Sequence, residues 1–546
     1  MSQKRNFKKL LVILVTVILL ASWATLSMAG FAADLGKNEA VQEGEERPIV
    51  FLPQEPRFVA VSTPDGQSFL VVRRRINVYQ PRPKQITIPV TAVNLASGGE
   101  LKLLQLVVSD KSGRVRLKLT PNATLESVAD LAFNKEELLT FFEQSGKPGF
   151  TTLTEKSYAQ PVVVPVGDLG LEEGDSLTLL ITATFGNANL EQQTTAETLV
   201  AVTSLPSRPN WYAGDGHIHT SWSDGGSWNT PNRRAADAKA DGFKWIIITD
   251  HEDLIRRNGG WSSYVSEINA AQSNNGIVVA PGAEIGCVQI QGDESSPELG
   301  HALGYRLKES ATSIPKNKYY TPQNLINAIN NHNYPYSYPV IAHPYHGTIW
   351  QDWSVTGFRA IELISCQWNA NSSTISRWVS LLRAGLSNTI AGKGFVVGVG
   401  NTDAHYFHTP GSDGASWIYA PNYSSTNRAA VWDAIKMGRV SAAGAPNFGA
   451  FAINGCAQGS VVRVPAGGSF TFTVVRQPMS LWSCVKFEII NANGNVVKTV
   501  NNPGPETRIS WTAPSQDWFY FVRFVFQDPE GINSEVWANP IFLDVY

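Results

Sequence analysis

Apolar and polar residues alternate along much of the first 200 residues, which is typical of β-strands. The segments with this pattern, or with a short apolar run between turn residues, are 57–62, 68–73, 85–93, 101–109, 114–120 and 176–185. A single short helix is predicted at residues 135–143, and a proline-rich linker follows at 205–209. The pattern predicts a β-sandwich over residues 34–206. We favour a structural or spacer role for it over carbohydrate or partner binding.

The period of the pattern changes after residue 210. Short apolar runs lie at 245–249, 276–280, 340–342, 358–364 and 395–399, and helical patterns lie between them. Thr230-Pro231 and Thr321-Pro322 each place an N-cap residue before a proline at the first helical position. Strands that alternate with helices predict a parallel sheet, and closure into a barrel would bring the strand ends to one rim.

Strand patterns return after residue 446. The segments are 448–453, 468–476, 484–490, 507–511 and 518–526, with Asn493-Gly494 as a tight turn. This pattern predicts a small immunoglobulin-like β-sandwich. The chain is therefore expected to be multidomain, with boundaries at 34–206, 207–445 and 446–546.

Length and composition agree with this division. A chain of 546 residues suggests roughly three domains, and 43% hydrophobic with 16% charged residues is typical of globular proteins. The formal net charge is −2. Because no strongly basic region is present, nucleic-acid binding is not expected as the main role.

The N-terminus has the features of an export signal. Basic residues at 4–9 precede an apolar run at 10–20, and small residues near 27–32 provide cleavage sites. We predict a signal peptide over residues 1–33 and an extracytoplasmic location, secreted or periplasmic. The alternative is an uncleaved anchor, because residues 10–29 are long enough to span a bilayer. The membrane would then be contacted through this segment alone.

An extracytoplasmic location would allow disulfides among the four cysteines. The simplest pairing joins Cys456 to Cys484 within the C-terminal module and Cys287 to Cys366 within the central one. Four cysteines allow three connectivities, and the sequence does not choose between them.

Candidate chemistry gathers in the central region. All nine histidines lie between His217 and His408. His217 and His219 are one residue apart on a strand, so their imidazoles point to the same side. The other candidates follow the ends of predicted strands: Asp250, His251, Glu284, His343, Asp403 and His405. We therefore expect them to converge at one rim.

Imidazole and carboxylate ligands without thiolate suit divalent Zn, Mn or Fe. Such ions lower the pKa of bound water from about 15.7 to near 7 and so supply hydroxide at neutral pH. The sequence has no Gly-x-Ser-x-Gly elbow and no P-loop. These observations favour metal-dependent hydrolysis over a serine nucleophile.

At these residues the chain resembles the polymerase and histidinol phosphatase (PHP) superfamily of metal-dependent phosphoesterases over about 211–445. The matching motifs are His217-Ile218-His219, Ser223-Asp224-Gly225, Thr249-Asp250-His251, Glu284, Gly300-His301, Ala342-His343-Pro344 and Asp403-Ala404-His405. The resemblance implies a distorted seven-stranded (β/α) barrel with two or three metal ions. The segments at 211–215 and 537–541 also look like the CehA/McbA branch, whose substrates are varied.

Carried over by motif, the first ion would be bound by His217, His219, Glu284 and Asp403. A second ion would share Glu284 and take His301 and His343. A third would be bound by Asp224, His251 and His405, with Asp224 standing where some relatives have histidine.

Two further residues are candidates for catalysis. We predict that His346 donates a proton to a leaving group or binds a phosphate oxygen, and that Asp250 orients His251 or a neighbour. The alternative for His346 is an exposed loop position. The sequence thus predicts an exported hydrolase of phosphoesters using a metal-activated hydroxide. A hydrolase of carboxyl or carbamate esters, or a non-catalytic binding protein, are the alternatives. The sequence gives no oligomeric state.

Overall fold

The computed structural model describes residues 46–53, 58–64, 68–79, 85–94, 102–120, 123–124, 126–127, 156–165, 169–186, 191–226, 228–405 and 409–546. The predicted signal peptide at 1–33 and the helix predicted at 135–143 lie outside these residues. No helix in the described part of the chain is both long and apolar enough to cross a membrane.

The N-terminal part consists of two β-sheets that share one hydrophobic core. One sheet has the order β2 (Phe58–Ser62), β3 (Ser68–Arg73), β5 (Gln85–Asn94), β10 (Lys156–Pro165), β9 (Glu126–Ser127). The other has the order β4 (Arg75–Tyr79), β12 (Glu191–Thr203), β11 (Ser176–Gly186), β6 (Lys102–Asp110), β7 (Val115–Leu119), with β8 (Ala123–Thr124) beside β6. Leu70 and Val72 of the first sheet and Val108 and Ile181 of the second belong to this core. The alternating pattern thus forms two sheets around one core, and the predicted sandwich domain at 34–206 stays a prediction.

The central part contains helices around two sets of strands. The first set is β13 (Trp211–Asp215), β14 (Trp245–Ile248) and β15 (Val278–Pro281), which run parallel. The second is β16 (Ala283–Val288), β17 (Glu298–Tyr305), β18 (Tyr338–Ile341), β19 (Ala360–Ser365) and β20 (Val397–Asn401). The helices are α3 (Pro231–Ala240), α4 (Glu252–Arg257), α5 (Gly260–Asn275), α6 (Pro322–His332), α7 (Ser372–Ala384), α8 (Leu386–Ile390) and α9 (Arg428–Lys436). As predicted, Thr230 caps α3, its side chain accepting a hydrogen bond from Arg233 N.

Closure of the central strands into one parallel barrel is not observed among the described residues, because the strands form two separate sheets. The antiparallel β16–β17 and β17–β18 pairs interrupt the parallel order. The sheets nevertheless adjoin on both sides. The chain passes from β15 to β16 through Gly282, and Ser416 Oγ in β21 (Ala415–Tyr419) bonds both Gly400 N and Gly400 O in β20. Single parallel bridges, Ile218 with Ala404 and His251 with Glu284, join the strand ends.

The C-terminal strands belong to two sheets. The strands β25 (Val461–Val464), β27 (Ser483–Asn491), β28 (Asn495–Asn501), β30 (Trp518–Gln527) and β31 (Asn533–Val545) continue the first central sheet. The strands β23 (Phe448–Ile453), β24 (Cys456–Ala457), β26 (Ser469–Gln477) and β29 (Glu506–Thr512) form a separate four-stranded sheet. β31 pairs with β22 (Val440–Ala443), which pairs with β21, and β1 (Arg47–Pro48) adds to the far edge at β28. One core runs through the central and C-terminal strands. Residue 446 thus lies within a continuous fold, and the domain boundaries stay predictions.

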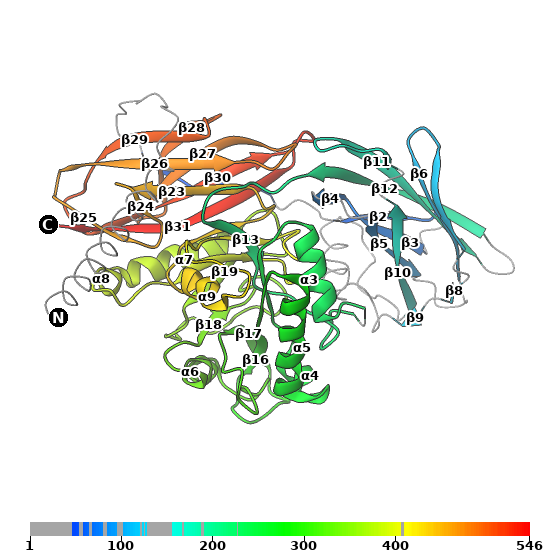
Figure 1. Cartoon of the computed structure of the whole chain (residues 1–546), viewed down its shortest axis with the longest axis horizontal. Helices are drawn as coiled ribbons and strands as arrows, with labels where there is room; N and C mark the ends of the chain where they lie inside the picture. The colour runs from blue at the N-terminus through cyan, green and yellow to red at the C-terminus, as the bar shows by residue number, and fades with distance from the viewer. Residues whose placement is uncertain are drawn as a thin grey trace, which may run out of the picture.

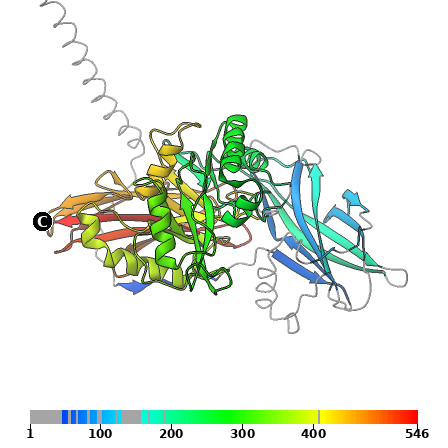
Figure 2. The same cartoon turned by 90° about the horizontal axis from the view of Figure 1, so that it is seen from below.

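The three parts lie along the long axis of the molecule. The N-terminal sheets lie at one end, whereas the C-terminal strands lie alongside the central strands and helices and reach the other end (Figures 1 and 2). Both flanking parts therefore border the region that holds the histidines.

The predicted disulfides are wrong, because all four cysteines are free thiols. Cys287 Sγ donates to Gly300 O, and Cys366 Sγ donates to Thr402 O, so these two buried thiols have separate backbone partners. Cys484 is buried in β27, whereas Cys456 is exposed on β24 in a different sheet. Neither predicted pair is brought together in space, although the two cysteines of each pair belong to the same sequence module.

Candidate metal centre

The rim where β13, β14 and β20 end carries the paired histidines. His217 O accepts a hydrogen bond from Ala404 N, and His219 N donates to Ala404 O. Ile218 between them accepts a bond from Thr249 N. These bonds hold the segment extended after β13, so both imidazoles face the same interior space. Both side chains are fully buried.

The first group of donor atoms comprises His217, His219, Glu284 and Asp403, whose ligand atoms lie within 4.8 Å of one another. The Nε2 atoms of both histidines are 3.2 Å from Asp403 Oδ1. They lie 3.4 and 3.2 Å from Glu284 Oε2. Two imidazole nitrogens and two carboxylate oxygens thus point at one small volume.

The second group comprises Glu284, His301 and His343. Glu284 Oε1 is 2.8 Å from His301 Nδ1 and 2.9 Å from His343 Nε2. Because its Oε2 faces the first group, the Glu284 carboxylate lies between the two groups with one oxygen toward each. This is the arrangement of a carboxylate that bridges two metal ions.

The third group comprises His219, Asp224, His251 and His405. Asp224 Oδ2 lies 3.4 Å from His251 Nε2 and 3.3 Å from His405 Nε2. His219 Nδ1 lies 3.1 Å from Asp224 Oδ1. Since His219 Nε2 faces the first group, its Nδ1–H is available to Asp224 as a hydrogen-bond donor. We therefore assign His219 to the first group and Asp224, His251 and His405 to the third.

The donor set fits divalent cations on two observations. Asp403 Oδ1 is buried without a hydrogen-bond donor, although two imidazole Nε2 atoms face it. Those Nε2 atoms, in His217 and His219, are only 3.2 Å apart. If both are unprotonated, their lone pairs and the carboxylate form a buried, electron-rich concavity. A cation would neutralise it, and buried charge without such a partner is costly.

The pKa shifts of the candidate ligands also indicate a site that favours a bound cation. Burial acts to lower the pKa of His217, but the carboxylates of Asp403, Glu362 and Glu284 hold it well above its usual value. Burial acts to raise the pKa of Glu284, but the imidazoles of His301, His217 and His251 hold it well below. The cluster therefore favours added positive charge, which either protons or metal ions can provide.

Outer partners fix the orientation of the imidazoles. His217 Nδ1 is 3.0 Å from Glu362 Oε1, and Asn401 Nδ2 donates to the same oxygen at 2.7 Å. The other Glu362 oxygen accepts from His343 N at 2.7 Å. His301 Nε2 is 3.0 Å from Glu298 Oε1. Histidines that bind metals commonly donate their second N–H to a carboxylate in this way.

The sequence pattern assigned no role to Glu298, Asn401 or Arg234. Arg234 lies in α3, is buried, and donates from Nε to His219 O and from one Nη to Ala404 O. Its guanidinium thus holds together two strands that carry ligands. Arg234 differs from its exposed neighbour Arg233 in being buried. The sequence pattern does not indicate which of the two arginines is buried.

Two candidate ligands have strained backbones. His343 has a φ of 26° and Asp403 a φ of 52°, in the left-handed region that is unfavourable for residues other than glycine. Each comes directly after a buried strand end. Strain at such positions is typical of functional sites, where the surrounding structure maintains a geometry that the site requires.

The two residues predicted to act in catalysis lie outside the three groups. Asp250 is buried, and its carboxylate accepts bonds from Thr220 N, Thr220 Oγ1 and Ser223 Oγ at 2.7, 2.7 and 2.5 Å. It therefore fixes the turn that leads to Asp224, which is a positioning role. His346 is partly exposed three residues after His343, and its backbone N donates to His343 O. A role in proton donation stays a prediction.

Replacing Glu362 tests the outer partners. Glu362→Gln keeps the size of the side chain but removes the charge that faces the Nδ1–H of His217. We expect metal affinity or turnover to fall about 10–100-fold, the range typical of such partners. Isothermal titration with Zn²⁺ and Mn²⁺ measures the first. An unchanged affinity and turnover would show that Glu362 is only structural.

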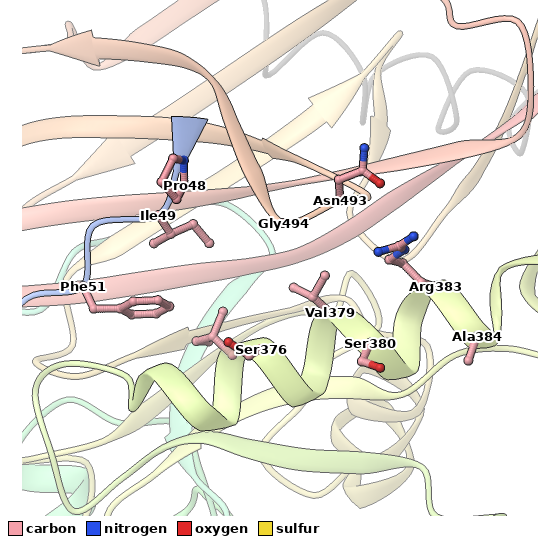
Figure 3. Close-up of a pocket in the computed structure, with 11 residues that line it drawn as sticks. Pro48, Ile49, Phe51, Ser376, Val379, Ser380, Arg383, Ala384, Asn493 and Gly494 are labelled. Carbon is pink, nitrogen blue, oxygen red and sulfur yellow. The ribbon is translucent and has the colours of Figure 1, made fainter. Parts of the chain in front are cut away.

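A separate cavity of about 630 Å³ lies away from these groups (Figure 3). The cavity is lined by Pro48, Ile49 and Phe51, by helix α7 and by the turn at Asn493 and Gly494. Its lining contains Arg383 and two serines but no histidine or carboxylate. It therefore lacks the donor atoms for metal chemistry.

Comparisons with known proteins give only distant similarities. No protein-family model matches the chain, and no curated protein matches it. Among solved structures, a two-domain protein from Bacteroides vulgatus containing a predicted PHP-like metal-dependent phosphoesterase is 14% identical. The match has a TM-score of 0.34 and covers 61% of this chain and 98% of that one.

Two other solved structures are weaker matches. PsfC from Pseudomonas syringae is 16% identical with a TM-score of 0.28, covering 39% of this chain and 84% of that one. A β-glucuronidase of Parabacteroides merdae is 9% identical with a TM-score of 0.16, covering 90% and 63%. Likenesses this weak carry no functional weight. The case for a multinuclear metal centre in this chain therefore rests on its own buried histidines and carboxylates.

Proposed function

We propose that this chain is a metal-dependent hydrolase, and specifically a phosphoesterase with a di- or trinuclear centre. The observation that supports it best is the position of Glu284. Its two carboxylate oxygens face separate donor groups, Oε2 the first group and Oε1 the second. Bound divalent ions would supply a water of lowered pKa and positive charge for the oxygens of a phosphoryl group.

The protein's own residues would orient and protect that centre. Glu362 and Glu298 hold the second nitrogens of His217 and His301. Asp224, with a side chain 40% exposed, is the most open member of the three groups. Substrate would therefore approach from the side of the third group, where His251 and His405 are also 20% exposed.

The motif resemblance to the PHP superfamily and its CehA/McbA branch supports the same class. Because that branch acts on varied substrates, hydrolysis of carboxyl or carbamate esters is the second candidate. Export to an extracytoplasmic compartment is also a proposal, and it is supported by the sequence features of residues 1–33 alone.

A substrate screen with matched variants tests the proposal. The purified chain, depleted of metal and reloaded with Zn²⁺, Mn²⁺ or Fe²⁺, is assayed on phosphomonoesters, phosphodiesters, carboxyl esters and carbamates. We expect phosphoester turnover that requires metal and is lost in His217→Ala. His332→Ala is the control, since His332 lies outside the three groups, where its Nδ1 accepts from Lys308 N and its Nε2 bonds Ser313 O.

Other results would change the assignment. Metal-dependent turnover of carboxyl esters or carbamates alone would establish the second candidate. Full metal occupancy with no turnover of any class would favour a binding protein. Phosphoester turnover that survives both metal removal and His217→Ala would contradict the proposal.

A further inference from the structure

Arg73 of the N-terminal sandwich reaches into the central part of the molecule. It lies at the end of β3, and its guanidinium forms an ion pair with Asp413 and a hydrogen bond to Ser412 Oγ at 3.1 Å. The two charged side chains are only 7% and 4% exposed. A buried pair of this kind is strongly coupled, because each charge would be costly without the other.

Asp413 belongs to the segment 409–414, which precedes β21. Trp368 Nε1 donates to Asp413 Oδ1 at 3.0 Å, so the carboxylate has partners on both sides. Gly411 in the same segment has a φ of 75° and lies against the ring of Phe243, which leaves no room for a side chain. The segment is therefore held in one place by charge and by packing.

This segment is hydrogen-bonded to two side chains that lie next to the candidate ligands in sequence, those of Asp215 and Thr402. Gly411 N donates to Asp215 Oδ2 at 2.9 Å and to Thr402 Oγ1 at 2.8 Å. Thr402 Oγ1 donates to Gly414 O at 2.8 Å. Thr402 is adjacent to Asp403, so the segment fixes the strand end that carries this candidate ligand.

Asp215 also connects this segment to the backbone of His217. Asp215 Oδ1 accepts from His217 N and from Thr402 N, each at 3.1 Å. Asp215 and Thr402 are both fully buried. A continuous series of hydrogen bonds and one ion pair thus leads from Arg73 through the segment 409–414 to the two strand ends that carry His217 and Asp403.

We infer that Arg73 is a positioning residue for the metal centre: its ion pair with Asp413 holds the segment 409–414, and that segment holds the strand ends bearing Asp403 and His217. The N-terminal sandwich then contributes to the site and is not only a spacer. The inference rests on the proposed metal centre.

The chain offers a matched control in Arg75. Arg75 of the N-terminal sandwich forms a second buried ion pair, with Asp528 of the C-terminal part. These two side chains are 1% and 0% exposed. Asp528 also accepts hydrogen bonds from the backbone N–H groups of residues 530 and 532. The Arg75 guanidinium also lies over Trp482, whose ring contacts Trp368, the donor to Asp413. Arg75→Met therefore removes a comparable buried ion pair but leaves every ion pair and hydrogen bond of the proposed series in place.

Titration of metal-free full-length protein with Co²⁺, followed by its visible absorption, tests the inference. We expect Arg73→Met to raise the Kd of at least one Co²⁺ ion about tenfold and to alter the spectrum, as loss of an outer partner does. Arg73→Lys, which keeps the charge, should recover most of the affinity. Arg75→Met should lower Tm yet leave Co²⁺ affinity within about twofold, as expected of an independent site.

If Arg73→Met does not fold, the double variant Arg73→Met/Asp413→Asn replaces it, because this variant leaves neither charge of the pair buried alone. It should show the same tenfold weakening. A Co²⁺ affinity in either variant equal to wild type would refute the inference while leaving the proposed function intact. Failure of the wild-type protein to bind Co²⁺ at all would refute both.

Discussion

Glu284→Gln is expected to abolish hydrolysis and to remove metal from two of the three groups. The carboxylate is 1% exposed and places one oxygen beside His217 and His219 and the other beside His301 and His343. An amide carries no charge, and one of its two ends is a donor that would face these nitrogens. The loss in kcat/KM should exceed about 100-fold, the upper end for residues that only support a ligand.

Steady-state kinetics and metal analysis by mass spectrometry measure this effect together. The control is Glu309→Gln, because Glu309 is 41% exposed and pairs with Arg428 at the surface. Surface ion pairs contribute little, so this variant should match wild type. A Glu284→Gln variant with wild-type metal content and turnover would show that the carboxylate does not bridge.

Removal of metal is expected to lower the Tm of the protein substantially. Asp403, Glu284 and Asp224 are buried or partly buried carboxylates gathered among imidazoles, and without cations their charge is balanced only by protons. A ligand present at about 1,000 times its Kd adds about 4 kcal/mol to stability. For a protein of this size, we expect chelation to lower the Tm by about 5–10 °C.

Differential scanning calorimetry at neutral pH, before and after chelation and after metal is restored, measures this change. The decrease should be reversed by Zn²⁺ or Mn²⁺. It should be absent in the double variant His217→Ala/Glu284→Gln, which lacks members of two groups. A Tm that does not respond to chelator or to added metal would contradict the assignment of these residues as ligands.

Most of the candidate ligands could be found from sequence because they stand within a few residues of the end of a buried strand. The strand ends near 215, 250, 283, 342 and 402 were recognisable from short apolar runs, and the side chains that follow them converge. His301 is a different case. It lies within β17, whose register against β16 sets its distance from Glu284, and only the family motif pointed to it.

The supporting residues could not be found in this way. Arg234 and Arg233 are neighbours in α3, and only the packing of the helix decides which one is buried. Glu298 reaches His301 through the fold of the β16–β17 hairpin, and Asp413 is linked to Arg73 over 340 residues of sequence. Such contacts depend on tertiary structure, which single-sequence periodicity does not encode.

The predicted barrel is not detected among the described residues and the predicted disulfides are absent, for related reasons. Periodicity identified buried strands but gave no strand direction, so the antiparallel β16, β17 and β18 were not anticipated. The disulfide prediction assumed that two cysteines of the same sequence module would lie close together in space. The buried thiols of Cys287 and Cys366 instead bond to different carbonyl groups.

A crystal structure with anomalous scattering data at the Zn and Mn edges, from protein purified without chelator, tests the central claim most directly. We predict anomalous peaks about 2.0–2.6 Å from the donor atoms of each occupied group, with two peaks on opposite sides of the Glu284 carboxylate. The claim of a metal centre would be contradicted if crystals grown with excess metal showed no anomalous peak, and the imidazoles and carboxylates were hydrogen-bonded to one another.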